Sequence, residues 1–214
     1  MTSAPLLRIR GLQTYFPVRR GILQRTVAHV HAVDGVDLDI APGETVGLVG
    51  ESGCGKSTLG RTLLGLVPST AGEIWFQGKQ LSTSNGFRSK RVHREMQIIF
   101  QDPFGSLDPR MRVRQTVGEG LAIHGMGGRH DRQKRVAEIL ARVGLRPEAA
   151  DHFPHEFSGG QRQRIGIARA LIVEPTFVVA DEPVSALDVS IQSQVLNLLV
   201  ELKREFHLTY LFVA

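Results

Sequence analysis

The sequence predicts one α/β domain with a mainly parallel sheet, an antiparallel β subdomain at the N-terminus and a helical insertion in the middle. Three observations support this fold class. Short apolar runs of strand length recur along the 214 residues, the earliest of them alternate apolar and polar residues, and the middle of the chain changes to helical periodicity. The composition, with 42% hydrophobic and 22% charged residues, is that of an ordinary globular protein.

The composition excludes some functional classes and leaves others open. The chain has no run of about 18 apolar residues, and its first residues, MTSAPLLRIR, lack the apolar segment of a signal peptide. We therefore expect neither a membrane-spanning helix nor a secretory leader, and the single cysteine suits a reducing cytoplasm. The net charge of +5 fits a solvated surface, nucleic acid, an anionic membrane face or a phosphorylated ligand.

The first strands are predicted to form an antiparallel, half-exposed sheet. Residues 7–16, 36–40 and 73–76 alternate apolar and polar side chains. A turn at Pro42 and Gly43 joins the second of these runs to the next strand, so we expect antiparallel pairing there. Residues 81–94 are polar and rich in serine, which predicts a loop.

Four other runs predict the parallel sheet. They are nearly all apolar, which is typical of strands that are covered on both faces. These runs are residues 45–49, 97–100, 177–180 and 209–213.

The stretch GESGCGKST follows the apolar run TVGLVG and matches the phosphate loop, Gly50-x4-Gly55-Lys56-Ser57. A buried strand is expected before it and the helix-compatible STLGRTLLGL follows it. Its glycines let successive backbone N–H groups turn inward around an anion at a helix N-terminus. Lys56 would reach the β- and γ-phosphates, and Ser57 would offer its hydroxyl to Mg²⁺.

This loop predicts a P-loop NTPase core that binds a nucleotide. The alternative, a glycine-rich strand-to-helix turn without a ligand, is disfavoured by the flanking strand and helix. Cys54 could be read as a nucleophile, but it has no obvious partner base, and the loop needs only a small side chain there. The expected nucleotide contacts are Gly50, Glu51, Ser52, Gly53, Cys54, Gly55, Lys56, Ser57 and Thr58.

Helices are predicted between residues 113 and 171. The segment DRQKRVAEILARVGL repeats its apolar positions at helical spacing, with Asp131 as the N-cap and Gly144 as the C-cap. A later helix over residues 188–206 carries one apolar stripe, made of Ile191, Val195, Leu198, Leu199, Leu202 and Phe206.

A second anion site is predicted in FSGGQRQRIGIARAL, far beyond Lys56 in the chain. A serine and two glycines cap what should be a helix N-terminus, where backbone N–H groups are free to bind an anion. Two such sites are one too many for one triphosphate, unless the second serves the nucleotide of a neighbouring chain. The residues concerned are Ser158, Gly159, Gly160 and Gln161.

Two adjacent carboxylates end the apolar run in FVVADEP. Asp181 would hold Mg²⁺ through its water shell, and Glu182 would polarise the attacking water. A helix cap or a surface pair is the usual explanation of such a pair alone, but it is disfavoured beside the two anion sites.

At this point the chain resembles the ATPase subunit of ABC transporters, along essentially its whole length. GESGCGKST resembles that family's Walker A motif, FSGGQ its signature, FVVADE its Walker B motif and SALD, which ends at Asp188, its D-loop. Gln101, in IIFQDPFGSLDP, matches the Q-loop glutamine. The resemblance implies ATP and Mg²⁺ as cofactors, Glu182, Gln101 and Lys56 as catalytic residues, and Ser57, Gln101 and Asp181 at the metal.

The resemblance also implies a domain division and a dimer. Residues of about 1–100 and 174–214 would form the catalytic core with its antiparallel β subdomain, and about 101–173 the helical subdomain that carries the signature. In a sandwich dimer, the phosphate loop of one subunit and the signature of the other would close on one ATP. An aromatic residue at the end of the first strand would stack on adenine; Phe16 is favoured by register over Tyr15.

Within the family, the chain looks most like the second ATPase of bacterial dipeptide/oligopeptide importers, although nickel and glutathione importers look similar. The partners implied are a second ABC ATPase, identical or related, two membrane permease subunits and a periplasmic or lipid-anchored solute-binding protein, with no nucleic acid. The chain would lie peripherally on the cytoplasmic face of the bacterial inner membrane. Residues 104–114 are a plausible contact with a permease helix.

Other classes are an ABC ATPase of DNA repair or translation and a non-hydrolysing regulatory module. The first usually carries paired cassettes, coiled-coil insertions or zinc motifs, and this chain has one cassette and no C-x2-C. The second is suggested by the C-terminus, because the family's switch histidine would follow LTYLFVA and none of the eight histidines takes its place. His207 precedes the last strand, so we expect a truncated member that binds ATP and turns it over more slowly, by on the order of 10²–10³.

Overall fold

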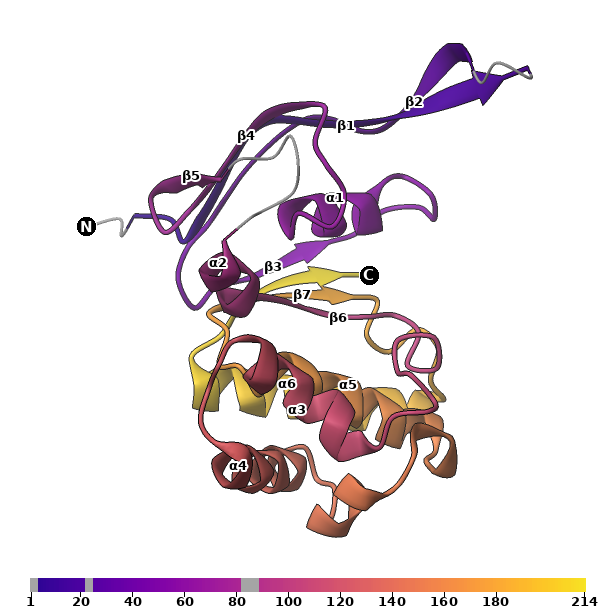
Figure 1. Cartoon of the computed structure of the whole chain (residues 1–214). Helices are drawn as coiled ribbons and strands as arrows, with labels where there is room; N and C mark the ends of the chain where they lie inside the picture. Colours follow the sequence, from indigo (N-terminus) through magenta and orange to yellow (C-terminus); the bar gives the residue numbers. More distant parts are fainter. Residues whose placement is uncertain (1–3, 22–24, 82–88) are drawn as a thin grey trace.

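The computed structural model describes residues 4–21, 25–81 and 89–214, and it contains two four-stranded sheets (Figure 1). Helix α1 lies between the two sheets, and a layer of helices covers the other face of the second sheet. The predicted α/β class is confirmed, with one antiparallel and one parallel sheet. The strands are β1 Leu7–Arg20, β2 Arg25–Ile40, β3 Thr45–Leu48, β4 Ala71–Phe76, β5 Lys79–Leu81, β6 Met96–Ile99, β7 Phe177–Asp181 and β8 Thr209–Val213. The α-helices are α1 Lys56–Leu63, α2 Lys90–Glu95, α3 Val113–Ile123, α4 Arg129–Arg142, α5 Gly159–Leu171 and α6 Val189–Phe206.

The antiparallel sheet has the strand order β2-β1-β4-β5. Strand β2 is much longer than the predicted residues 36–40, because it pairs with β1 from Leu7–Ile40 out to Arg20–Arg25. Most of the extra residues of β2 are exposed, so backbone pairing rather than core packing holds them. The two strands therefore continue past the sheet as a ribbon that projects from the molecule (Figure 1).

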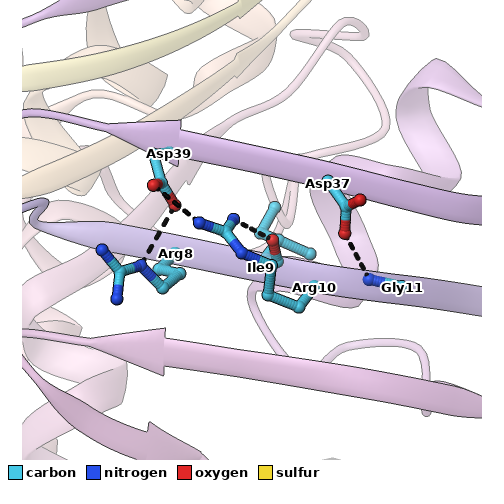
Figure 2. A network of polar contacts seen from close by, with 6 residues as sticks. All are labelled: Arg8, Ile9, Arg10, Gly11, Asp37 and Asp39. Atoms are coloured by element: carbon cyan, nitrogen blue, oxygen red, sulfur yellow. Dashed lines mark hydrogen bonds and ion pairs between the residues drawn. The ribbon is translucent and has the colours of Figure 1, made fainter.

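Polar contacts on the exposed face of this sheet join the first part of β1 to the last part of β2, as Figure 2 shows. Arg8 and Arg10 both reach the Asp39 carboxylate, at 3.3 and 2.8 Å. The hydrogen bond from Arg10 is the main reason that the pKa of Asp39 is below its usual value. The backbone N–H of Gly11, which has a positive φ of 54°, donates to Asp37 Oδ1 at a shift in the β1–β2 register.

The parallel sheet has the strand order β3-β8-β7-β6, made of the four predicted apolar runs. Strand β8 pairs in parallel with the Walker B-like strand β7, from Phe177–Thr209 to Asp181–Val213. Strand β7 is buried at all five positions, but β3 is an edge strand and is half-exposed, contrary to the expectation that both its faces are covered.

The turn at Pro42 and Gly43 is present, with a φ of 74° at Gly43, but the predicted antiparallel pairing across it is wrong. Strand β2 before the turn belongs to the antiparallel sheet, and β3 after it pairs with β8 in the parallel sheet. A turn motif specifies only a local change of direction, and here the chain passes from one sheet to the other.

Two further local expectations need correction. Residues 81–94 are not all loop, because α2 begins at Lys90; residues 82–88 lie outside the described part. Helix α4 begins earlier than predicted, after Gly128, and Asp131 is its third residue, where Oδ2 accepts from the Gly128 N–H. Gly144 does follow the helix end, with a φ of 74°.

Two hydrophobic cores lie on the two faces of the parallel sheet. On one side Phe177, Val179 and Leu211 pack with α1 and the antiparallel sheet; on the other, Val178 and Tyr210 pack with the helices. The stripe predicted for residues 188–206 is buried in the second core at Val195, Leu198, Leu199 and Leu202. Together the cores fix the carboxyl ends of β3 and β7 beside the start of α1. No helix in the described ranges is both long and apolar enough to cross a membrane.

Candidate functional site

The phosphate loop connects the end of β3 to the start of α1. Gly53 and Gly55 have φ of 82° and 97°, in the left-handed region that favours glycine. A Cβ on Gly55 would lie 1.8 Å from the carbonyl oxygen of Ala32 in β2, so only glycine fits there. The loop is therefore held against the antiparallel sheet, and it ends at a helix N-terminus with no acidic residue in its first turn.

The Lys56 side chain lies across this loop and bonds to the backbone at its start. It is 9% exposed, and its Nζ donates to the carbonyl oxygens of Gly50 at 2.6 Å and of Glu51 at 3.0 Å. These backbone contacts hold the ammonium group across the loop. The arrangement suits a ligand with several negative charges, because the cation and the helix N-terminus face the same loop.

Ser57 and Asp181, which are 124 residues apart in the chain, meet beside the loop. Ser57 Oγ donates to Asp181 Oδ1 at 2.7 Å. Asp181 is only 1% exposed, and its Oδ2 accepts no hydrogen bond from any residue that the structure describes. The nearest cation is Arg61, whose Nη2 lies 3.6 Å from that oxygen. A buried carboxylate oxygen without a hydrogen bond, next to a hydroxyl, suits a hard divalent cation.

Glu182 follows Asp181 in a left-handed conformation, with a φ of 44°. Its Oε2 accepts a hydrogen bond of 2.6 Å from Gln101 Nε2. The structure thus brings together two of the predicted catalytic residues. Gln101, which is also in the predicted metal set, contacts Glu182 rather than Asp181. A non-glycine residue at positive φ beside a buried carboxylate is typical of a functional site.

The predicted signature residues lie in the helical layer, at the start of α5. Ser158 is the N-cap: its Oγ accepts from the Gln161 N–H, and the Gln161 side chain accepts from the Ser158 N–H. A Cβ on Gly160 would meet Ile191 of α6 at 2.5 Å, so Gly160 is also required for packing. Within the described ranges, no hydrogen bond joins this motif to the phosphate loop of the same chain.

Asp188, the predicted D-loop residue, is the N-cap of α6 and is exposed. Its backbone oxygen accepts from Ile191 and Gln192. This role is structural. The Asp188 carboxylate itself makes no cap hydrogen bond to α6.

Phe16 is 42% exposed on the ribbon. Thr14, two residues earlier, bonds Thr62 of α1, so alternation places Phe16 on the α1 side of β1. Tyr15 points to the other face, where its hydroxyl donates to Asp34 and its ring stacks on His31. The register thus favours Phe16 over Tyr15 as the residue that is free to contact a ligand near the loop.

Several residues that support the site were not predicted from the sequence. Arg61 lies four residues after Ser57, one helical turn along α1, and this spacing could have indicated it. Gln163, Arg162 and Arg169 of α5 were also missed. They contact the segment on both sides of Gln101, at the Phe100 carbonyl, the Phe104 ring and the Ser106 carbonyl.

Comparisons with known proteins agree with this geometry. The family model of the ABC transporter matches residues 33–185. The oligopeptide transport ATP-binding protein AppF of Bacillus subtilis is 54% identical over 218 residues, which cover 100% of this chain and 66% of AppF. The glutathione import ATP-binding protein GsiA of Pectobacterium atrosepticum is 53% identical over 212 residues, covering 99% of this chain and 34% of GsiA.

Among solved structures, the dimeric post-hydrolysis state of the ATP-binding cassette MJ0796, bound to ADP and Pi, superposes with a TM-score of 0.81 at 28% identity. The match covers 97% of this chain and 87% of that one. The chain therefore spans most of a solved cassette. Of the curated relatives, it spans slightly less than two thirds of AppF and about one third of GsiA.

Proposed function

The chain belongs to the ABC transporter family, and from this premise we propose that it binds and hydrolyses ATP to drive an importer for short peptides. The observation that carries the proposal is the Ser57–Asp181 hydrogen bond beside the Lys56-closed loop. Residues 124 positions apart in the chain meet there, so that a binding site for a polyanion and oxygen ligands for a cation lie side by side.

In the proposed mechanism, the loop and Lys56 bind the β- and γ-phosphates, and Lys56 exchanges a backbone carbonyl for phosphate oxygen. Ser57 and Asp181 would hold Mg²⁺, which supplies charge neutralisation between the phosphates when it is bound. Arg61 would then lose its place beside Asp181 Oδ2. Glu182 would orient the attacking water, and Gln101 would fix the Glu182 carboxylate through the bond already present.

The signature residues would act on the ATP of a second subunit. Their helix N-terminus is an anion site in the helical layer, apart from the phosphate loop of the same chain. The solved cassette MJ0796 is described as dimeric with ADP and Pi bound, which supports a dimer here. The second subunit would be identical or a relative.

For the imported solute, we propose di- or oligopeptides. This is supported by the name of AppF, an oligopeptide transport protein. GsiA is named for glutathione import, and glutathione remains the alternative substrate. The other proposed partners are two permease subunits and a solute-binding protein, with this chain on the cytoplasmic face of the bacterial membrane.

A groove of about 370 Å³, lined by the segment after α1 and by α2, β6 and α3, is the place where a permease helix would dock. Leu66 and Ile123 line it and are 56% and 59% exposed, although both are large and apolar. The predicted contact segment, residues 104–114, lies next to it along the chain, and the Arg162 guanidinium lies over the exposed Phe104 ring. Leu66→Asp with Ile123→Asp should abolish co-purification with the permeases while ATP affinity is unchanged. Full co-purification of the double variant would exclude the groove.

The ATP site itself is tested by Lys56→Ala. We expect loss of measurable Mg-ATP binding in a fluorescence titration, because the phosphates lose their closest cation. Lys134→Ala is the matched control, since Lys134 is 74% exposed and only 4.0 Å from Glu138 on α4. Unchanged ATP affinity of Lys56→Ala, or equal loss in both variants, would contradict the proposal.

A further inference from the structure

Three side chains form a cluster where the β1–β2 ribbon leaves the antiparallel sheet. The hydroxyl of Tyr15 donates to Asp34 Oδ1 at 2.5 Å, and Nδ1 of His31 lies 3.6 Å from Asp34 Oδ2. The rings of Tyr15 and His31 are stacked, with centroids 3.9 Å apart and an interplanar angle of 12°. Each member therefore contacts the other two.

This cluster is not part of either core. The side chains of His31 and Asp34 are 53% and 58% exposed, so their contacts add little to the burial of apolar surface. The contacts instead constrain backbone. Tyr15 lies on β1, while His31 and Asp34 lie on β2, on the two sides of a shift in the register between the strands.

The shift is a bulge at Ala32. Val33 pairs with Thr14 and His31 pairs with Tyr15, so Ala32 is the extra residue. The same Ala32 presents its carbonyl oxygen to Gly55, the residue of the phosphate loop that precedes α1. The bulge that the cluster encloses is thus the contact between the ribbon and the phosphate loop.

The cluster also determines which aromatic ring faces the loop. Tyr15 is held on the far side of β1 by its stacking and its hydrogen bond. Phe16 must then point to the opposite side, the side on which Thr14 bonds Thr62 of α1. A one-residue slip of β1 against β2 would exchange the two rings.

We infer that Tyr15, His31 and Asp34 are positioning residues for the nucleotide base. They fix the Ala32 bulge, and the bulge sets the distance between the phosphate loop and the Phe16 ring. The inference rests on the proposed ATP binding. The ring would stack on the adenine, and the cluster would hold the ring at the distance at which one ATP fills both sites. A ligand without a base needs the loop but not the ring.

The test compares Mg-ATP with inorganic tripolyphosphate, in equilibrium titrations of the parent chain, four single variants and one double variant. Tyr15→Phe keeps the ring and removes the hydroxyl, and Asp34→Asn keeps the shape and removes the charge. Phe16→Ala removes the proposed platform. His29→Gln is the matched control, because His29 is exposed on the same ribbon and pairs with Pro17, outside the cluster.

We expect Tyr15→Phe and Asp34→Asn to weaken ATP binding by about fivefold to tenfold and to leave tripolyphosphate affinity unchanged. In the Phe16→Ala background, Tyr15→Phe should have no further effect, since the ring that it positions is gone. His29→Gln should match the parent chain with both ligands.

Three outcomes would overturn the inference: unchanged ATP affinity in both cluster variants, equal losses for ATP and tripolyphosphate, or additive effects of Tyr15→Phe and Phe16→Ala. In each of these three outcomes the proposed function still holds, provided that the parent chain binds ATP. If the parent bound neither ligand, the proposed function would fail, and the inference with it.

Discussion

Gly55 carries two constraints at once, since it has a φ of 97° and lies against the carbonyl of Ala32. Gly53, two residues earlier, has a φ of 82°, but a Cβ added to it would meet no atom within 4 Å. Gly53→Ala should therefore lower the free energy of unfolding only by the conformational cost, about 1–3 kcal/mol. Gly55→Ala should lower it by more, because strand β2 must move as well. Urea unfolding of both variants measures this, and equal losses would contradict the close contact.

The residues of the site could be predicted only where local sequence holds the chemistry. Lys56 and Ser57 follow from the glycine spacing, and Asp181 and Glu182 follow from a buried strand that ends in two carboxylates. The sequence does not contain the contacts between them. The Ser57–Asp181 bond and the Gln101–Glu182 bond depend on how β3, β6 and β7 are ordered in the sheet, which no local pattern specifies.

At the scale of elements, β8 contains a buried polar group that its packing does not satisfy. The Tyr210 side chain has an exposed fraction of 3%, and its hydroxyl has no hydrogen-bond partner among the described residues. Burial also raises the pKa of this hydroxyl above its usual range. Tyr210→Phe should thus raise the free energy of unfolding, by about 1 kcal/mol, because an unpaired polar atom leaves the core.

Thermal and urea unfolding of Tyr210→Phe against the parent chain check this. Thr209→Val is the contrasting substitution in the same strand, because it removes a hydroxyl that has a partner. Thr209 Oγ1 accepts a hydrogen bond from the Gly43 N–H at 2.8 Å. That variant should be destabilised. A destabilised Tyr210→Phe would mean that the hydroxyl has a partner in solution.

The elements themselves could be predicted where periodicity and burial agree. Strand β7 and helix α6 appear where expected, because each has one continuous apolar pattern that the core requires. The extension of β2 could not be predicted, since its residues are exposed and only the pairing with β1 holds them. The turn at Pro42 failed as a hairpin signal because the two strands around it enter different sheets.

At the scale of the whole molecule, the two predicted anion sites lie in different layers. The phosphate loop lies by α1, between the sheets, while the signature begins α5 in the helical layer (Figure 1). The sequence predicts that one site serves a neighbour, because it contains two such sites for one triphosphate, and this stays a prediction. The division at about residues 101 and 173 remains a prediction. It agrees with the hydrogen bonds from α5 to the Phe100 and Ser106 carbonyls, on the two sides of Gln101.

The most direct test of the account is the mass of the Glu182→Gln variant by light scattering, with and without Mg-ATP. The substitution should leave the phosphate loop and the Ser57–Asp181 pair intact and remove the carboxylate that is proposed to orient the water. Bound ATP should then persist and hold two chains together. The account predicts twice the mass of one chain in Mg-ATP and a single chain without it. A variant that binds ATP but keeps the mass of one chain would contradict the shared ATP site.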